Sequence, residues 1–187
     1  AVFRRKSLAC GVDAAVSILL DTSGSMRSRM AQAANVTYAL ALAFQRIPGV
    51  QTSVDVFPGP GVPFEEVLQF KQNINSAKGR LEMVEAGGGT PTGSAMQARL
   101  PKLLATRAEK KVVIVVTDGQ PNYGDEQSLT HAVVGEAARH GVTVIGIGIN
   151  AEVGDYFAHH VDVESVDDLA SALDALFKGE LAALLAA

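Results

Sequence analysis

Short runs of β-branched apolar residues alternate along this chain with longer segments of helical periodicity, and this alternation limits the possible folds most strongly. The clearest run is Val112–Val116, and Ala14–Leu20 is nearly as continuous. Continuous apolar runs of this length are typical of strands buried on both faces. Between residues 30 and 47, apolar residues return every three or four positions, which indicates a helix. Such alternation predicts an α/β fold with a doubly wound, mostly parallel central sheet flanked by helices on both faces.

The predicted elements extend over nearly the whole chain of 187 residues, and one sheet accounts for that length. We therefore expect a single domain over residues 1–187. Its basic first segment, Ala1–Lys6, starts abruptly, so we expect the natural protein to be longer. Strands are predicted at 14–20, 52–57, 66–70, 111–117, 142–149 and 161–163, and helices at 30–47, 74–84, 94–104, 129–140 and from Ser165 to about Leu185.

Composition excludes several classes of function. The chain is 48% hydrophobic and 19% charged, unlike a disordered protein, and its net charge of −4 leaves no basic footprint for nucleic acid. No apolar run reaches the roughly 20 residues that span a bilayer, so we expect no membrane partner. The single cysteine, Cys10, cannot form an internal disulfide. That suits a reducing compartment, and we expect a cytoplasmic location.

Three polar loops lie at or beside the ends of predicted strands. Asp21–Ser25 follows the first strand, Thr117–Pro121 follows the strand over 111–117, and the glycine-rich loop Gly87–Gly93 precedes a helix. In an open parallel sheet, ligands bind at the carboxyl ends of the strands. The loops therefore predict a binding site at one edge of the sheet.

The chemistry of these loops predicts a hard divalent cation. They offer carboxylates and hydroxyls, with no Cys or His nearby. Alternate residues of a tight loop can turn to one side, so Asp21, Ser23 and Ser25 can converge, and we expect Gly24 to permit the turn. Oxygen ligands select Mg²⁺, Mn²⁺ or Ca²⁺ over Zn²⁺ or Cu²⁺, and a site with only two carboxylates favours Mg²⁺.

The pattern Asp21-x-Ser23-x-Ser25, with a later Thr and Asp118, resembles the metal-ion-dependent adhesion site of von Willebrand factor type A domains. The resemblance covers essentially the whole chain, with all three loops in order. It implies that the Ser23 and Ser25 hydroxyls coordinate the ion, that Thr90 does so directly or through water, and that Asp21 and Asp118 act mainly through waters. The remaining position is then left to water or to an acidic side chain of a protein partner, which makes the chain a non-catalytic interaction module.

Thr92 is the alternative to Thr90 as the threonine of the glycine-rich loop that coordinates the ion. Thr90 is preferred because the family's threonine follows the small residues directly. Thr92 is then expected to support the loop or to cap the helix that begins near Ser94.

Three segments, one of which contains the metal loop, resemble one branch of the family. These are Val2–Arg5, Ser17–Met26 and Tyr38–Ala43, which are similar to the C-terminal domain of cobaltochelatase T subunits, relatives of the magnesium chelatase D subunit. The resemblance implies the C-terminal part of a longer protein of cobalamin biosynthesis that works with an AAA+ ATPase and chelatase subunits. No Walker A motif is present, so the chain is not expected to hydrolyse ATP.

The competing hypothesis is a metal-dependent phosphatase or phosphoryl-transfer enzyme of the dehalogenase type. Such enzymes need D-x-D, and here Ser23 takes the second position. The three loops also lack a His or Glu that could act as a general base.

His159 and His160 are a tempting second metal site, but neighbours on a strand point to opposite faces, so we expect solvated or structural roles. Arg27 and Arg29, beside the first loop, are either solvated charges or residues that attract an acidic partner.

Overall fold

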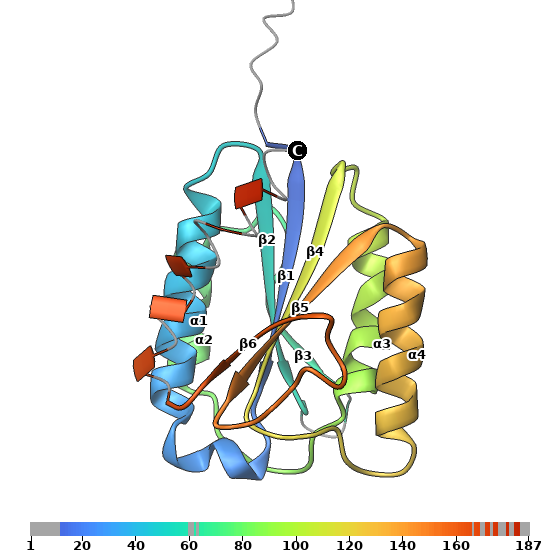
Figure 1. Ribbon diagram of the computed structural model, residues 1–187. Coiled ribbons are helices and arrows are strands. Elements are labelled where there is room, and N and C mark those ends of the chain that lie inside the picture. The colour runs from blue at the N-terminus through green and yellow to red at the C-terminus, as the bar shows by residue number, and fades with distance from the viewer. Residues whose placement is uncertain are drawn as a thin grey trace, which may run out of the picture.

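A central sheet organises the computed structural model (Figure 1), which describes residues 12–59, 62, 64–165, 167–168, 171–172, 174–175, 179 and 182–183. Within this part of the chain the strands follow the order β3-β2-β1-β4-β5-β6. All neighbours are parallel except β3, which pairs antiparallel with β2. The predicted α/β fold with a mostly parallel sheet is confirmed. The strands are β1 (Ala14–Asp21), β2 (Val50–Phe57), β3 (Glu65–Leu68), β4 (Lys110–Thr117), β5 (Val142–Ile149) and β6 (His159–Val163).

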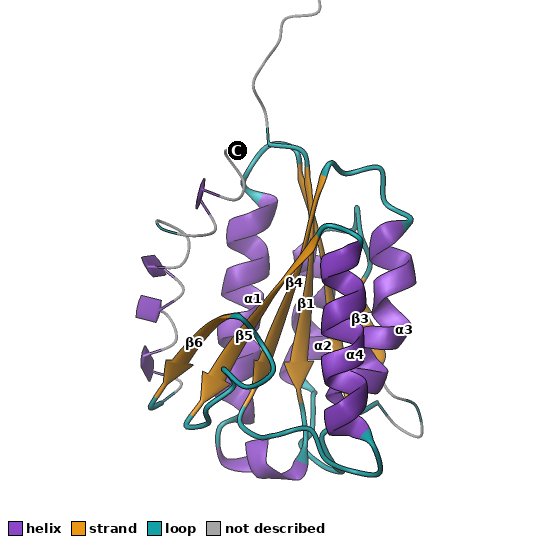
Figure 2. Cartoon of the chain, turned by 45° about the vertical axis from the view of Figure 1, so that its right-hand side comes forward, coloured by secondary structure: helices purple, strands orange, loops and turns teal. Residues whose placement is uncertain are grey.

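Helices cover both faces of the sheet. Figures 1 and 2 show α1 and α2 on one face and α3 and α4 on the other. This double cover explains why β1 is buried along its whole length and reads as one apolar run. The α-helices are α1 (Met30–Gln45), α2 (Lys78–Glu82), α3 (Thr92–Leu104) and α4 (Glu126–Arg139), and the 3-10 helices are η1 (Gly24–Ser28) and η2 (Ile74–Ala77).

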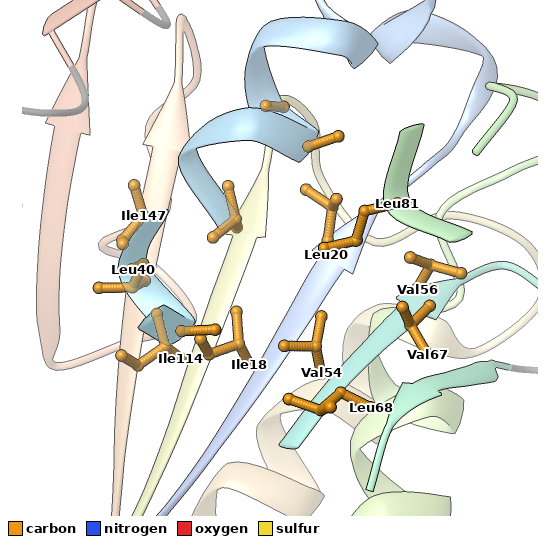
Figure 3. Packing of buried hydrophobic residues seen from close by; sticks show 14 of the residues in the cluster. Ile18, Leu20, Leu40, Val54, Val56, Val67, Leu68, Leu81, Ile114 and Ile147 are labelled. Atoms are coloured by element: carbon orange, nitrogen blue, oxygen red, sulfur yellow. The ribbon is translucent and has the colours of Figure 1, made fainter. Parts of the chain in front are cut away.

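Two hydrophobic clusters fill the space between the sheet and the helices. Alternate residues of β1 contribute to different clusters, because successive side chains of a strand point to opposite faces. Ile18 and Leu20 pack with Leu40 of α1 and Leu81 of α2 (Figure 3). Leu19 packs in the cluster beneath α3 and α4. The strand that carries the first polar loop is thus held rigidly from both sides.

The direction in which successive strands are added to the sheet reverses at β1. From β1 the chain runs outward to β2 and β3, and α3 then leads to β4 on the other side of β1. Leu20 of β1 pairs with Val116 of β4, so the loops that follow these two strands leave the sheet side by side. Ligands of open α/β sheets bind at such a switch point.

Several element boundaries differ from the sequence-based expectations. The helix predicted at 74–84 is divided into η2 and the short α2, and Gly79 lies within α2, where it lowers helix propensity. α3 begins at Thr92 rather than near Ser94, and α4 begins at Glu126 rather than at Leu129. β6 starts two residues before the predicted strand, and β3 covers 65–68.

Some predictions fall outside the described residues. Ala1–Lys6, with Val2–Arg5 inside it, and Cys10 are among the undescribed positions, as are many residues of the helix predicted from Ser165 to about Leu185. Within the described part of the chain, no helix is both long and apolar enough to span a membrane.

Candidate metal centre

Asp21 ends β1 and its side chain is fully buried. One carboxylate oxygen accepts a hydrogen bond from the backbone N–H of Ser23 at 2.7 Å, and the other accepts one from the Thr117 hydroxyl at 2.5 Å. The pKa of Asp21 is raised to about 6: burial and, to a smaller extent, the nearby Asp118 raise it, while the hydrogen bonds from Thr117 and Ser23 lower it. The carboxylate is thereby fixed in orientation and joins the first loop to the end of β4.

Ser23, Ser25 and Asp118 form a continuous chain of polar contacts. The two serine hydroxyl oxygens lie 3.0 Å apart, and the Ser25 hydroxyl donates to Asp118 Oδ1 at 2.6 Å. Ser25 and Asp118 are 93 positions apart in the sequence, so this contact joins the loop Asp21–Ser25 to the loop Thr117–Pro121. Asp21, Ser23, Ser25 and Asp118 therefore lie in one cluster at the switch point.

Arg29 borders this cluster. Its Nη1 lies 3.5 Å from Asp118 Oδ2 and also 3.5 Å from the carbonyl oxygen of Ile149, to which it donates a hydrogen bond. Its side chain is 28% exposed. Arg29 is therefore not a fully solvated charge, since it holds the second oxygen of Asp118 and partly balances the negative charge of the site.

The glycine-rich loop is joined to the first loop through the backbone. The N–H of Gly87 donates to the carbonyl of Thr22 at 2.8 Å, and the N–H of Gly24 donates to the carbonyl of Gly88 at 3.0 Å. Gly88 has a φ of 75°, a region that glycine enters without steric cost. Gly24 is not among the positive-φ residues, and a Cβ there would meet only ordinary contact. The expectation that Gly24 supplies the turn is wrong; the special backbone is at Gly88.

Thr90 is held by Asn122 of the β4–α4 loop. Asn122 accepts from the Thr90 N–H at 3.0 Å, donates to the Thr90 hydroxyl at 3.3 Å, and donates its own N–H to the Thr90 carbonyl at 3.1 Å. Thr90 is buried, and its hydroxyl bonds to Asn122 rather than to the serine–aspartate cluster. The structure thus places Thr90 on a loop that is bonded to that of Ser23, without a direct hydrogen bond to the cluster.

Thr92 occupies the first position of α3, and its buried hydroxyl has no hydrogen-bond partner among the described residues. The predicted capping role is therefore not seen, although its N–H donates to the Thr90 carbonyl at 2.9 Å. Glu126 of α4 takes the capping role, because its carboxylate accepts bonds from both the N–H and the hydroxyl of Ser94.

Sequence reasoning did not assign roles to Thr117, Asn122 and Glu126. Thr117 directly precedes Asp118 at the end of a strong strand, so its position could have indicated a role. Asn122 and Glu126 act on residues 32 positions away, and no local pattern indicates such pairings.

The donor chemistry of the cluster fits a hard divalent cation. Hydroxyl and carboxylate oxygens are gathered at one point, and they are the ligands that such ions prefer. In the described ranges, no group of three His, Cys, Asp or Glu side chains is arranged to hold a metal, so a cation here would depend on the hydroxyls. His160 lies apart from this cluster and contacts the carbonyl of Phe157 at 3.0 Å.

Comparison with known proteins supports the fold and shows the family. Residues 15–177 match the model of the von Willebrand factor type A domain. The protein NorD of Stutzerimonas stutzeri is 31% identical over 107 residues, which are 52% of this chain; the chain spans 17% of NorD.

Two solved structures illustrate the similarity of fold. The von Willebrand domain of the pilus tip protein Mfa5 from Porphyromonas gingivalis superimposes with a TM-score of 0.71 at 12% identity, covering 93% of this chain and 97% of that one. Proximal thread matrix protein 1 from the mussel byssus, whose adhesion-site motif is occupied by zinc, gives 0.70 at 17% identity, covering 90% and 46%.

Proposed function

Because this chain belongs to the von Willebrand factor type A family, we propose that it is a metal-dependent protein–protein interaction module whose cation is held by Ser23, Ser25, Thr90, Asp21 and Asp118. The observation that carries the proposal is the serine–aspartate cluster at the switch point, where Ser25 donates to Asp118 at 2.6 Å. The resident ion is proposed to be Mg²⁺, with Mn²⁺ or Ca²⁺ as alternatives. Zinc in the thread matrix protein shows that this motif accepts other divalent ions in that protein.

Some residues of the site are proposed to bind the ion, and others hold the loops in position. The Ser23 and Ser25 hydroxyls are neutral ligands, and they leave positive charge on a bound cation. Such a cation attracts the carboxylate of a partner protein, and a charge-assisted contact of this kind is stronger than a neutral hydrogen bond. Asp21 supports this arrangement by fixing the Ser23 backbone and the Thr117 hydroxyl.

The geometry argues against the phosphatase alternative. A nucleophilic aspartate must reach the substrate, but Asp21 is fully buried and both of its oxygens accept hydrogen bonds within the chain. The second position of the D-x-D motif is Ser23, which cannot act as a carboxylic acid. Turnover of a phosphate ester with Mg²⁺ that disappears in an Asp21→Asn variant would overturn the interaction-module proposal.

Thermal unfolding in EDTA and in millimolar Mg²⁺ tests the site directly. Ligand that binds only the folded state raises the unfolding temperature, so Mg²⁺ is expected to stabilise the wild-type chain. Ser25→Ala should remove this increment and lower the melting temperature in EDTA only slightly, because Ser25 is exposed and loses only its contacts with Ser23 and Asp118. Ser28→Ala, an exposed serine of the same 3-10 helix, is the matched control and should keep the increment. Equal melting curves with EDTA and Mg²⁺ would contradict the proposal.

We further propose a place in a cobaltochelatase-like complex, beside an AAA+ ATPase and chelatase subunits in the cytoplasm. Its support is the sequence resemblance of Ser17–Met26 and Tyr38–Ala43. Mixing the purified chain with such an ATPase and a large chelatase subunit tests it. Mg²⁺-dependent co-elution that Ser25→Ala abolishes is the expected result, and independent elution of all three would reduce the proposal to an interaction module with another partner.

A further inference from the structure

A surface groove with a volume of about 1030 Å³ lies directly beside the metal loops. Val56 of β2 and Val67 of β3 line it, together with the segment 83–89 that follows α2. Thr22 and Gly87–Gly89 belong both to this groove and to the loops of the candidate metal centre. The groove is therefore continuous with the site where a partner carboxylate is proposed to bind.

The exposed large hydrophobic residues of the described chain gather at this groove. They are Val62, Met83 and Tyr123, whose exposed fractions are 51%, 81% and 73%, and all three line it. Single exposed apolar residues scattered over a surface need no explanation, but a group of them around one hollow marks an interaction site. We call Val56, Val62, Val67, Met83 and Tyr123 the apolar groove.

Tyr123 is fixed against the metal loops. A Cβ atom on Gly89 would lie 1.9 Å from the Tyr123 ring, so the ring packs directly on the glycine backbone. Tyr123 has a φ of 81°, an uncommon conformation for a residue of this size, and such strain is often retained at functional positions. Its neighbour Asn122 holds Thr90. A fixed, exposed aromatic ring beside a polar centre is typical of an anchor in protein recognition.

Two carbonyl groups at the edge of the sheet beside the groove already accept hydrogen bonds. Arg80 of α2 donates to the carbonyl of Val67 at 2.9 Å and to the carbonyl of Glu66, and its Nη2 lies 3.4 Å from Glu65. These contacts occupy carbonyls of β3 that an added strand would need. Extension of the sheet by an added strand is therefore disfavoured at this edge.

We infer that the apolar groove holds large apolar side chains that neighbour the metal-binding acidic residue in a segment of a partner protein. This inference rests on the proposed function, since the carboxylate is attracted by the cation. Charge complementarity between cation and carboxylate positions the segment, and the continuity of the groove with the metal loops places the neighbouring side chains over Met83 and Tyr123. The occupant is thus an acidic–apolar segment, in contrast to an acidic segment with polar neighbours.

Selection from a displayed peptide library tests the inference. Each peptide carries one fixed Asp or Glu with five randomised residues on either side, and selection is carried out with the wild-type chain in Mg²⁺ and in EDTA. We expect Leu, Ile, Phe or Met to be enriched beside the acid in Mg²⁺. A selected peptide should lose about 5- to 30-fold in affinity when Met83→Ser or Tyr123→Ser removes an anchor. Replacing its apolar residues by Ser should cost a similar factor.

Met83→Ser is expected to keep the melting temperature and the Mg²⁺ increment of the wild type, because Met83 is 81% exposed and lies outside the metal loops in the sequence. Glu109→Ser, an exposed position before β4 at the opposite end of the strands, is the matched control and should bind the selected peptide as the wild type does.

The outcomes separate the groove from the metal site. Mg²⁺-dependent selection of acidic peptides with no apolar preference would overturn the inference and leave the proposed function intact. The same apolar preference in Met83→Ser/Tyr123→Ser would also overturn it. Apolar selection that persists in EDTA and is lost in the double variant would support the groove and contradict the metal-dependent function, and no selection at all would contradict both.

Discussion

Asp21 and Asp55 are fully buried aspartates on the neighbouring parallel strands β1 and β2, yet their surroundings differ. Asp21 lies at the loop end of its strand and accepts hydrogen bonds from neutral groups, a backbone N–H and a hydroxyl. Asp55 lies inside its strand and faces the buried Arg99 of α3, with Nε at 3.1 Å from Oδ2. The Asp21 carboxylate belongs to the polar loop cluster, and the Asp55 carboxylate is paired with a cation within the core.

The surroundings of Arg99 show how the core neutralises its charge. Nε donates to the hydroxyl of Ser17 at 3.1 Å, and Nη1 lies 3.6 Å from Glu66 Oε1. The guanidinium carbon is 4.8 Å from the centroid of the Phe70 ring. Arg99 thereby ties α3 to β1, β2 and the segment around β3. Since α3 directly follows the glycine-rich loop, this ion pair also holds the helix beside the candidate metal centre.

The largest expected effect comes from breaking the core pair. At about pH 8, above the pKa of Asp55, Arg99→Met leaves the Asp55 carboxylate buried without its cation and should lower the free energy of unfolding by about 3–5 kcal/mol. Urea denaturation measures the loss. The double variant Arg99→Met/Asp55→Leu should recover much of it, because no unpaired charge then stays buried. A loss below about 1 kcal/mol in the single variant would show that Asp55 does not depend on Arg99.

Asp21 and Asp55 are expected to respond differently to metal. Asp21→Asn should abolish the stabilisation by Mg²⁺, which for the wild type reaches about 2.7 kcal/mol at 100 times the dissociation constant. Asp55→Asn should retain that increment in full, since Asp55 lies outside the loop cluster. Calorimetric melts in EDTA and Mg²⁺ compare the two variants. Loss of the increment in both, or in neither, would remove the distinction between the two aspartates.

The pH dependence of stability sharpens the description of Asp55. Burial raises its pKa from 3.8 to about 7, against the lowering effects of Arg99 and Lys102. Between about pH 4 and pH 7 the folded state then keeps a proton that the unfolded state has lost, so the contribution of Asp55 to stability falls as pH rises through this window. The change is at most about 1.4 kcal/mol per pH unit for one group.

Urea denaturation of the wild type and of Asp55→Asn from pH 4 to pH 8 measures this contribution. The free energy of unfolding of the wild type minus that of the variant should decrease as pH rises. An increase with pH would mean that Arg99 outweighs burial and that the folded-state pKa of Asp55 lies below its ordinary value.

The smallest expected effect concerns the loop contacts. Asn122→Ala removes the two side-chain hydrogen bonds to Thr90 and should lower stability by about 1 kcal/mol, because Asn122 is exposed to solvent. It should also weaken Mg²⁺ binding, since the glycine-rich loop is less well held. Isothermal titration with Mg²⁺ measures the affinity. Unchanged affinity would show that Thr90 is not held in place for the ion by Asn122.

The fold and the loop pattern could be predicted from local patterns. The apolar runs at 14–20 and 111–117 indicated buried strands, and the three polar loops followed from strand ends that share one edge of the sheet. The early start of α4 at Glu126 was missed because Glu126 carries no apolar signal; it is held there by its contacts with Ser94 of α3. The Glu126 carboxylate caps α3 rather than α4, and a cap that comes from another element leaves no local pattern.

The sequence by itself determined the type of each main element, the doubly wound sheet and the oxygen-rich character of the loops, because periodicity and residue chemistry act over a few neighbouring positions. Only the tertiary structure decided that Ser25 meets Asp118, that Asn122 holds Thr90, that Arg99 faces Asp55, and that Met83 and Tyr123 line one groove. These contacts join residues far apart in the chain, and they form only when the packing of the helices on the sheet brings the loops and side chains together.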